Sequence, residues 1–161
     1  MITIHKKRTA SVTHIEIIGA FVDQIKLSNE IGEVSGELLI NCKGISRINS
    51  IGIKSWMHYF NELKTRGIKF NFELFPPALV EQINLISNFA CGGKVTSVLL
   101  PYSCIACRKE FVSPYSIEIL LSHQNQIPKL NCGKEKCEAT FDDEPDYLDF
   151  SEVVECSDRE H

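Results

Sequence analysis

The sequence has 161 residues, 43% of them hydrophobic, which is enough for one buried core and at most a small second unit. A formal charge of -4 and a pI near 5.7 exclude a general attraction to nucleic acid or anionic membranes. No apolar run approaches the ~20 residues of a membrane-spanning helix. Residues 1–8 lack the apolar core of a secretory signal, so we expect a cytoplasmic protein.

The first hundred residues alternate strand and helix patterns, which predicts an α/β fold. We expect strands at residues 2–6 and 14–18, the second ending at Gly19, and then a short helix in a polar segment. The apolar run at residues 38–42 lies between two glycines. It predicts a central strand that is covered on both faces.

The clearest helix pattern begins near Ser50 and covers residues 51–66. Its apolar stripe has helical spacing and consists of Ile53, Trp56, Met57, Phe60 and Leu63. Residues 68–74 then alternate as in a strand with one buried face. A second helix is expected from the Pro76-Pro77 pair to about residue 88, and a last strand at residues 95–100, with Pro101 ending the unit.

A short motif precedes the longest helix. The apolar strand at 38–42 is followed by Ile48-Asn49-Ser50-Ile51-Gly52-Ile53 and then by the helix. This order resembles the STAS family of anti-sigma factor antagonists, whose pattern is an apolar strand, Ile-Asp-Ser-Ser/Thr-Gly-Leu/Ile and a helix. The resemblance covers roughly residues 1–100, including Gly19 shortly before Asp23. It implies a STAS-like mixed sheet backed by helices.

In that family the serine after the motif aspartate is a phosphorylated switch. The resemblance therefore implies this role for Ser50, on a surface with Asn49 and Gly52 that binds a protein partner, an anti-sigma factor or related regulator. Two residues depart from the pattern, since Asn49 replaces the aspartate and Ile51 replaces the second hydroxyl residue. The residues themselves leave open that Asn49 or Ser50 only caps the helix, and that Gly52 only packs the helix start.

Seven cysteines in a chain without an export signal argue against a disulfide framework. Four of them form two short pairs, Cys104 with Cys107 and Cys132 with Cys137. Two such turns can complete a tetrahedron of thiolates around one zinc ion. We expect the remaining cysteines to be chemically inert.

The paired cysteines resemble a zinc ribbon, in which two knuckles hold one structural zinc. The second pair has four intervening residues where ribbons usually have two. Four thiolates leave no coordination position for a substrate, so the zinc is expected to be structural. Two alternatives stay open: His123 replaces one cysteine, or no metal binds.

We therefore expect a STAS-like domain at residues 1–100, a zinc-ribbon-like β segment at 101–141 and an acidic tail at 142–161. The tail has nine acidic residues against Arg159, a charge of about -8 that leaves about +4 on the rest. A fragment ending at Pro101 is expected to fold alone.

The preferred function is a non-catalytic protein-interaction module. The sequence has no phosphate-binding Gly-rich loop and no Ser/His/Asp arrangement with supporting context, which argues against an enzyme. Two alternatives stay open: a nucleic-acid-binding zinc ribbon, and a STAS domain that senses a small molecule such as a nucleotide. The near-neutral charge balance of residues 101–140 argues against the first.

Overall fold

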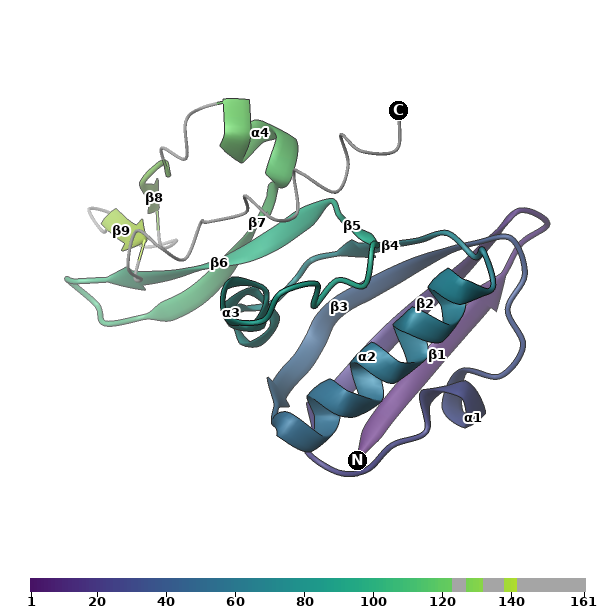
Figure 1. Ribbon diagram of the computed structural model, residues 1–161. Helices are drawn as coiled ribbons and strands as arrows, with labels where there is room; N and C mark the ends of the chain where they lie inside the picture. Colours follow the sequence, from purple (N-terminus) through teal and green to yellow (C-terminus); the bar gives the residue numbers. More distant parts are fainter. Residues whose placement is uncertain (123–126, 132–137, 142–161) are drawn as a thin grey trace.

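The structure is a computed structural model that describes residues 1–122, 127–131 and 138–141. Within these residues the chain is a mixed α/β protein with two β-sheets backed by helices (Figure 1). This agrees with the α/β fold class expected from the sequence. No helix in the described part of the chain is long and apolar enough to cross a membrane.

Five strands form the first sheet, in the order β1-β2-β3-β4-β5. Their bounds are β1 Ile2–Arg8, β2 Val12–Phe21, β3 Glu37–Ile48, β4 Phe70–Glu73 and β5 Lys94–Val95. Strand β1 runs antiparallel to β2, and the other neighbours are parallel. The strand expected at residues 38–42 is thus confirmed as the central one.

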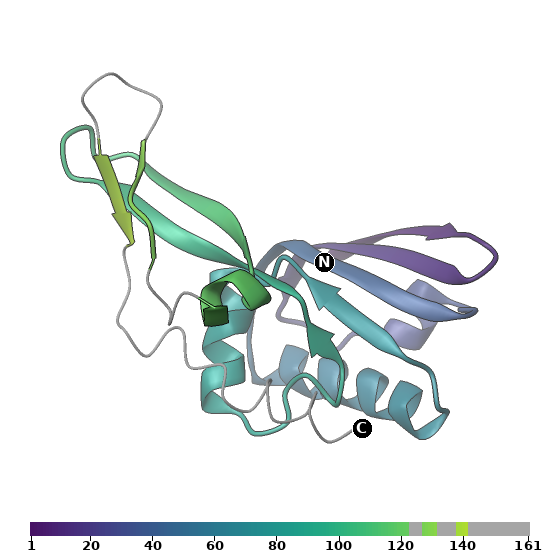
Figure 2. The same ribbon diagram turned by 90° about the horizontal axis from the view of Figure 1, so that it is seen from above.

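Four helices complete the described elements: α1 Leu27–Ile31, α2 Ser50–Thr65, α3 Pro77–Leu85 and α4 Ile117–Ser122. Helices α1 and α2 lie on the same face of the first sheet (Figures 1 and 2). The fully buried Trp56 anchors α2, because its ring lies 5.1 Å from that of Phe72 and 5.3 Å from that of Phe89. Its indole N–H donates a hydrogen bond to the Phe89 carbonyl at 3.1 Å.

Among the residues that the structure describes, those of the central strand β3 are fully buried on only one face of the first sheet. Along β3, Leu38, Ile40 and Cys42 are fully buried, whereas Leu39 and Asn41 on the other face are half-buried. The expectation that the central strand is covered on both faces is therefore wrong for the described residues. The apolar run was misleading because Leu39 lies on the open face.

Two strands continue through glycines that were expected to end them. Strand β2 runs past Gly19 to Phe21, and β3 runs past Gly44 to Ile48. Gly19 has φ +119°, and a Cβ there would lie 2.5 Å from the Met1 carbonyl oxygen. The pairing of β2 with β3 shifts register on both sides of this segment. The glycines thus mark irregular pairing and close backbone approach.

The second sheet has the order β7-β6-β9-β8 and is antiparallel throughout. Its strands are β6 Ser97–Cys104, β7 Glu110–Ser116, β8 Leu130–Asn131 and β9 Glu138–Phe141. The single strand expected at residues 95–100 is wrong, because β5 ends at Val95 and β6 belongs to this other sheet. Strand β6 also passes through Pro101, so the division expected at residue 100 lies inside a strand.

Pro101 fits in β6 because of its place in the sheet. Residue 101 pairs with Val112 of β7, whereas pairing with β9 on the other side begins only at Tyr102. Within the described residues, Pro101 therefore has a strand partner on one side only, where a residue without an N–H group is tolerated. The start of β6 is joined to the first sheet, since the Phe75 N–H donates to the Ser97 carbonyl and the Leu99 N–H to the Phe75 carbonyl, at 3.1 and 2.8 Å.

Candidate functional site

The motif at residues 48–53 lies where β3 passes into α2. Strand β2 ends nearby, because Phe21 is paired with Ile48 and the Asn49 N–H donates to the Phe21 carbonyl at 3.1 Å. In α/β sheets, ligands commonly bind at the carboxyl ends of parallel strands. This edge of the first sheet is therefore a candidate partner surface, and it contains the residues that the sequence singled out.

Asn49 is the N-cap of α2. Its side-chain Oδ1 accepts hydrogen bonds from the N–H groups of Ile51 and Gly52 at 3.1 and 3.0 Å. Its Nδ2 donates to the Val22 carbonyl at 3.0 Å and so ties the segment after β2 to the helix start. An aspartate could replace the two accepting contacts but not this donor. The question of which residue caps the helix is thus answered in favour of Asn49.

Ser50 is the first residue of α2 and is exposed, and Ile51 beside it is 47% exposed. The first turn carries no acidic side chain. A helix N-terminus has a partial positive charge that favours a phosphate group. The position is thus accessible to a partner and electrostatically suited to a negative charge.

Gly52 is buried, so it does not itself face a partner. A Cβ at this position would lie 2.0 Å from the Phe21 carbonyl oxygen and 2.7 Å from the Phe21 Cβ. Only glycine allows the first turn of α2 to approach the end of β2 this closely. Gly52 therefore positions Asn49 and Ser50.

The first cysteine pair lies in the turn between β6 and β7. Cys104, at the end of β6, is buried, and Cys107 is half-buried. The Cys104 N–H donates to the Lys109 carbonyl at 3.0 Å, and the Arg108 N–H donates to the Cys104 carbonyl at 2.7 Å. Arg108 has φ +58°, which tightens the turn. Both sulfurs thus belong to one compact turn, as a chelating pair requires.

Cys132, Cys137 and the alternative ligand His123 lie outside the described residues, as does the tail from residue 142. The residues that flank the second pair are described. Asn131 of β8 pairs with Glu138 of β9, and Ala139 of β9 pairs with Cys104. Cys137 thus comes two residues before the partner of Cys104. Within residues 1–122, 127–131 and 138–141, which hold only two of the four expected ligands, no three potential ligands form a metal-binding group.

Aromatic residues support the sheet next to the first cysteine pair. Tyr102 is buried and stacks on Phe111 of β7 with ring centroids 5.5 Å apart, and it pairs with Phe141 of β9. Its hydroxyl group lies 2.8 Å from that of Tyr115 and donates to the Pro128 carbonyl at 2.8 Å. Burial raises the pKa of Tyr102, and the hydrogen bond with Tyr115 raises it further. The tyrosine therefore stays neutral and holds three strands together.

Two other cysteines lie in the core of the first unit. Burial and the nearby Glu73 carboxylate raise the pKa of Cys42 well above 9.0. Burial raises the pKa of Cys91 to about 11, although Lys64 acts in the opposite direction. Both thiols are therefore protonated at neutral pH and unsuited to nucleophilic chemistry.

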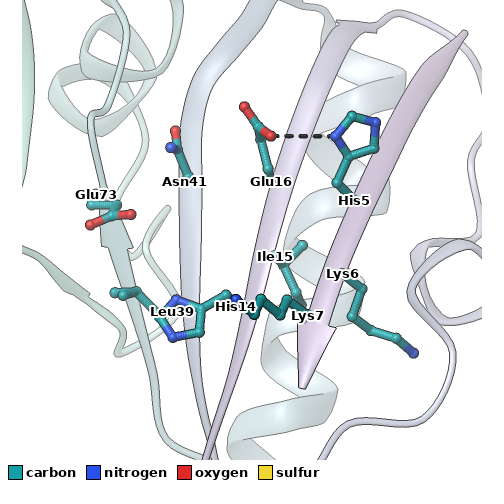
Figure 3. A pocket seen from close by; sticks show the side chains of 9 residues that line it. All are labelled: His5, Lys6, Lys7, His14, Ile15, Glu16, Leu39, Asn41 and Glu73. Atoms are coloured by element: carbon teal, nitrogen blue, oxygen red, sulfur yellow. Dashed lines mark ion pairs between the residues drawn. The ribbon is translucent and has the colours of Figure 1, made fainter. Parts of the chain in front are cut away.

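The open face of the first sheet has a hollow of about 310 Å³ that the sequence did not indicate. It is lined by side chains from four neighbouring strands, namely His5, Lys6, Lys7, His14, Ile15, Glu16, Leu39, Asn41 and Glu73 (Figure 3). We call this the open-face hollow. The alternation of polar with apolar residues along β2 could have predicted an exposed face, but the pairing that brings the four strands together has no signal in the sequence.

No match was found for this sequence among models of known protein families or among curated proteins.

Proposed function

We propose that this protein is a non-catalytic regulatory module that binds another protein, similar to the STAS domains of anti-sigma factor antagonists. The observation that carries the proposal is the exposed Ser50 at the N-terminus of α2, held there by the Asn49 cap. The strand order of the first sheet, with only β1 antiparallel, supports it, as does the motif at the step from the central strand to the longest helix.

The partner in this proposal is an anti-sigma factor or a related regulator that docks on the surface around Asn49, Ser50 and Ile51. Phosphorylation of Ser50 would add a charge of about -1.5 to -2 at the centre of that surface. Such a charge, and the volume of the phosphate, would obstruct a closely docked protein. The departure from aspartate at Asn49 is compatible with this role, because the amide is occupied in joining α2 to the segment after β2.

The second part of the proposal is a structural zinc ion held by Cys104, Cys107, Cys132 and Cys137. The tight turn of the first pair supports it, and so does the pairing of Ala139 with Cys104. When bound, the zinc would cross-link the turn after β6 to the segment between β8 and β9. The role of the second sheet would then be to extend or stiffen the partner-binding unit.

Two measurements on the full chain test the proposal. Elemental analysis should find one zinc per chain. Well under one zinc per chain, with the thiols of the four proposed ligands all reacting freely with a thiol reagent, would contradict the metal site. Affinity capture from native lysate, with and without a chelator, should retain a specific protein on the parent. That protein should be lost from a Ser50→Asp variant. Equal capture by the parent and by the Ser50→Asp variant would contradict a partner-binding surface around Ser50.

A further inference from the structure

The open-face hollow has two rows of side chains with opposite charge. In one row, strand pairing places Lys7 of β1 beside His14 of β2, and His14 beside Leu39 of β3. In the other row, His5 pairs with Glu16, Glu16 with Asn41, and Asn41 with Glu73 of β4. Figure 3 shows both rows on the same face of the sheet. The first row is cationic and the second is anionic.

The charges in these rows are only partly compensated within the described residues. Glu16 lies 3.4 Å from the His5 ring, a contact that carries opposite charges only when the histidine is protonated. Lys6 points away from the rows and donates to the Ile31 and Glu33 carbonyls at 2.7 and 3.0 Å. Lys7 and Glu73 have no ion-pair partner in the part of the chain that the structure describes. They remain available to a ligand.

The spacing of the rows selects a class of ligand. The two rows are two residues apart along each strand, which corresponds to about 6.6 Å. A dipeptide in an extended conformation separates its terminal ammonium and carboxylate groups by a similar distance, because each residue spans about 3.3–3.6 Å. A single α-amino acid is too short to reach both rows. A ligand that carries only negative charge would be repelled by the carboxylates of Glu16 and Glu73.

We propose that the open-face hollow binds a small dipolar, dipeptide-like molecule. Its carboxylate lies over Lys7 and His14, its ammonium group over Glu16, Asn41 and Glu73, and an apolar side chain on Leu39. The volume of about 310 Å³ is sufficient for such a molecule. Figure 2 shows α2 on one face of the first sheet, and the side chains that line the hollow lie on the other face (Figure 3), so this binding does not depend on the proposed partner surface.

Titration of the full chain with glycyl-leucine, followed by amide chemical shifts, tests the proposal. Shifts should concentrate on residues of β1 to β4 that line the hollow. N-acetylated glycyl-leucine and glycyl-leucine amide, which each lack one charge, should bind at least threefold more weakly. Lys7→Gln and Glu73→Gln should each weaken glycyl-leucine binding at least threefold. Lys54→Gln, an exposed residue of α2, serves as the matched control and should leave it unchanged.

Three outcomes would overturn the proposal. One is the absence of shifts in the hollow at millimolar probe. Another is equal binding of a blocked probe, which would mean that only one charged row is used. The third is an equal effect of the Lys54 variant. Unchanged amide spectra of the unliganded variants outside the hollow show that they are folded, so a loss of binding cannot come from unfolding.

Discussion

Asn49 serves two chain segments at once. Its side-chain oxygen accepts hydrogen bonds from two N–H groups of the first turn of α2, which have no partner within the helix. Its side-chain NH2 group donates a hydrogen bond to the Val22 carbonyl. Ser50 is exposed and has neither role. The stability of the helix start and the accessibility of the candidate switch residue therefore depend on different side chains.

This separation predicts the effects of substitutions at the two positions. Asn49→Ala should lower the free energy of unfolding by about 1–2 kcal/mol, because the cap and the contact with Val22 are both lost. Asn49→Asp should cost less, since a carboxylate still caps the helix and is favoured at its N-terminus. Ser50→Ala should change stability by less than about 0.5 kcal/mol. Denaturant unfolding measures all three, and a Ser50→Ala loss as large as that of Asn49→Ala would contradict the assignment of the cap.

The raised pKa of the buried Cys91 thiol predicts that the folded protein loses stability at alkaline pH. Its thiol has a pKa of about 11 in the folded chain and about 9 in the unfolded chain, so between these values the unfolded state releases a proton that the folded state keeps. The stabilisation is fully present below pH 9 and disappears as the pH rises toward 11. The loss of stability relative to neutral pH should amount to about 2 kcal/mol by pH 10.5. Tyr59, whose pKa burial raises to about 12, adds to the effect above pH 10.

Denaturant unfolding at several pH values tests this expectation. The parent should lose stability steadily above pH 9, and Cys91→Ala should have a flatter dependence over the range from pH 9 to 11. An equal slope in both proteins would show that Cys91 does not contribute.

At the scale of elements, the sequence predicted most of the first unit. The stripe from Ile53 to Leu63 and the alternation at residues 68–74 are strong local periodicities, and the structure has α2 and β4 there. The candidate site was also found by local pattern, because the motif at residues 48–53 joins a strand to a helix. A local pattern does not show which strands pair with one another. The strand pairing determines the second sheet and the open-face hollow, which the sequence did not predict.

Strand β6 illustrates the limit. Residues 95–100 read as one short strand of mainly apolar residues, interrupted by Thr96 and Ser97. Nothing local shows that Val95 pairs with β4 while Val98 pairs with β7. Pro101 is a residue that commonly ends a strand, yet β6 continues through it, and within the described residues it has a strand partner on one side only. The open-face hollow was missed for the same reason, because its two charged rows exist only once β1 to β4 are in register.

Strand β6 joins the two sheets, so we can predict which of its amides become exposed to exchange when zinc is removed. The Leu99 N–H donates a hydrogen bond to the Phe75 carbonyl of the first unit, whereas the Cys104 N–H donates to the Lys109 carbonyl within the turn of the first cysteine pair. If the proposed zinc is removed by a chelator, exchange of the Cys104 amide with solvent should accelerate at least tenfold, because the turn loses its cross-link. Exchange of the Leu99 amide should change less than threefold.

Hydrogen exchange measured by NMR distinguishes the two ends of the strand. Equal acceleration of both amides would mean that the two sheets open as one cooperative unit and that no division near residue 100 exists. No acceleration at Cys104 would mean that the turn does not depend on a bound metal.

At the scale of the whole molecule, three surfaces lie on different parts of the fold. The surface around Ser50 is at the start of α2, and the cysteine turn is at the far end of β6 (Figure 1). The side chains of the open-face hollow lie on the face of the first sheet opposite α2 (Figure 3). A protein partner bound at the first surface, as we propose, would therefore leave the other two accessible. This arrangement allows each surface to be altered by substitution without disturbing the others.

The most direct test of the central claim is the affinity of the captured partner, once purified, for two variants of α2. Ser50→Asp should raise the dissociation constant at least tenfold, or about 1.4 kcal/mol, with little loss of stability because an acidic residue is favoured in the first helical turn. Thr65→Asp places the same charge on another exposed hydroxyl position, the last residue of the same helix, and should change the constant less than twofold. An unchanged affinity of Ser50→Asp, or an equal loss in both variants, would contradict a partner surface at the start of α2.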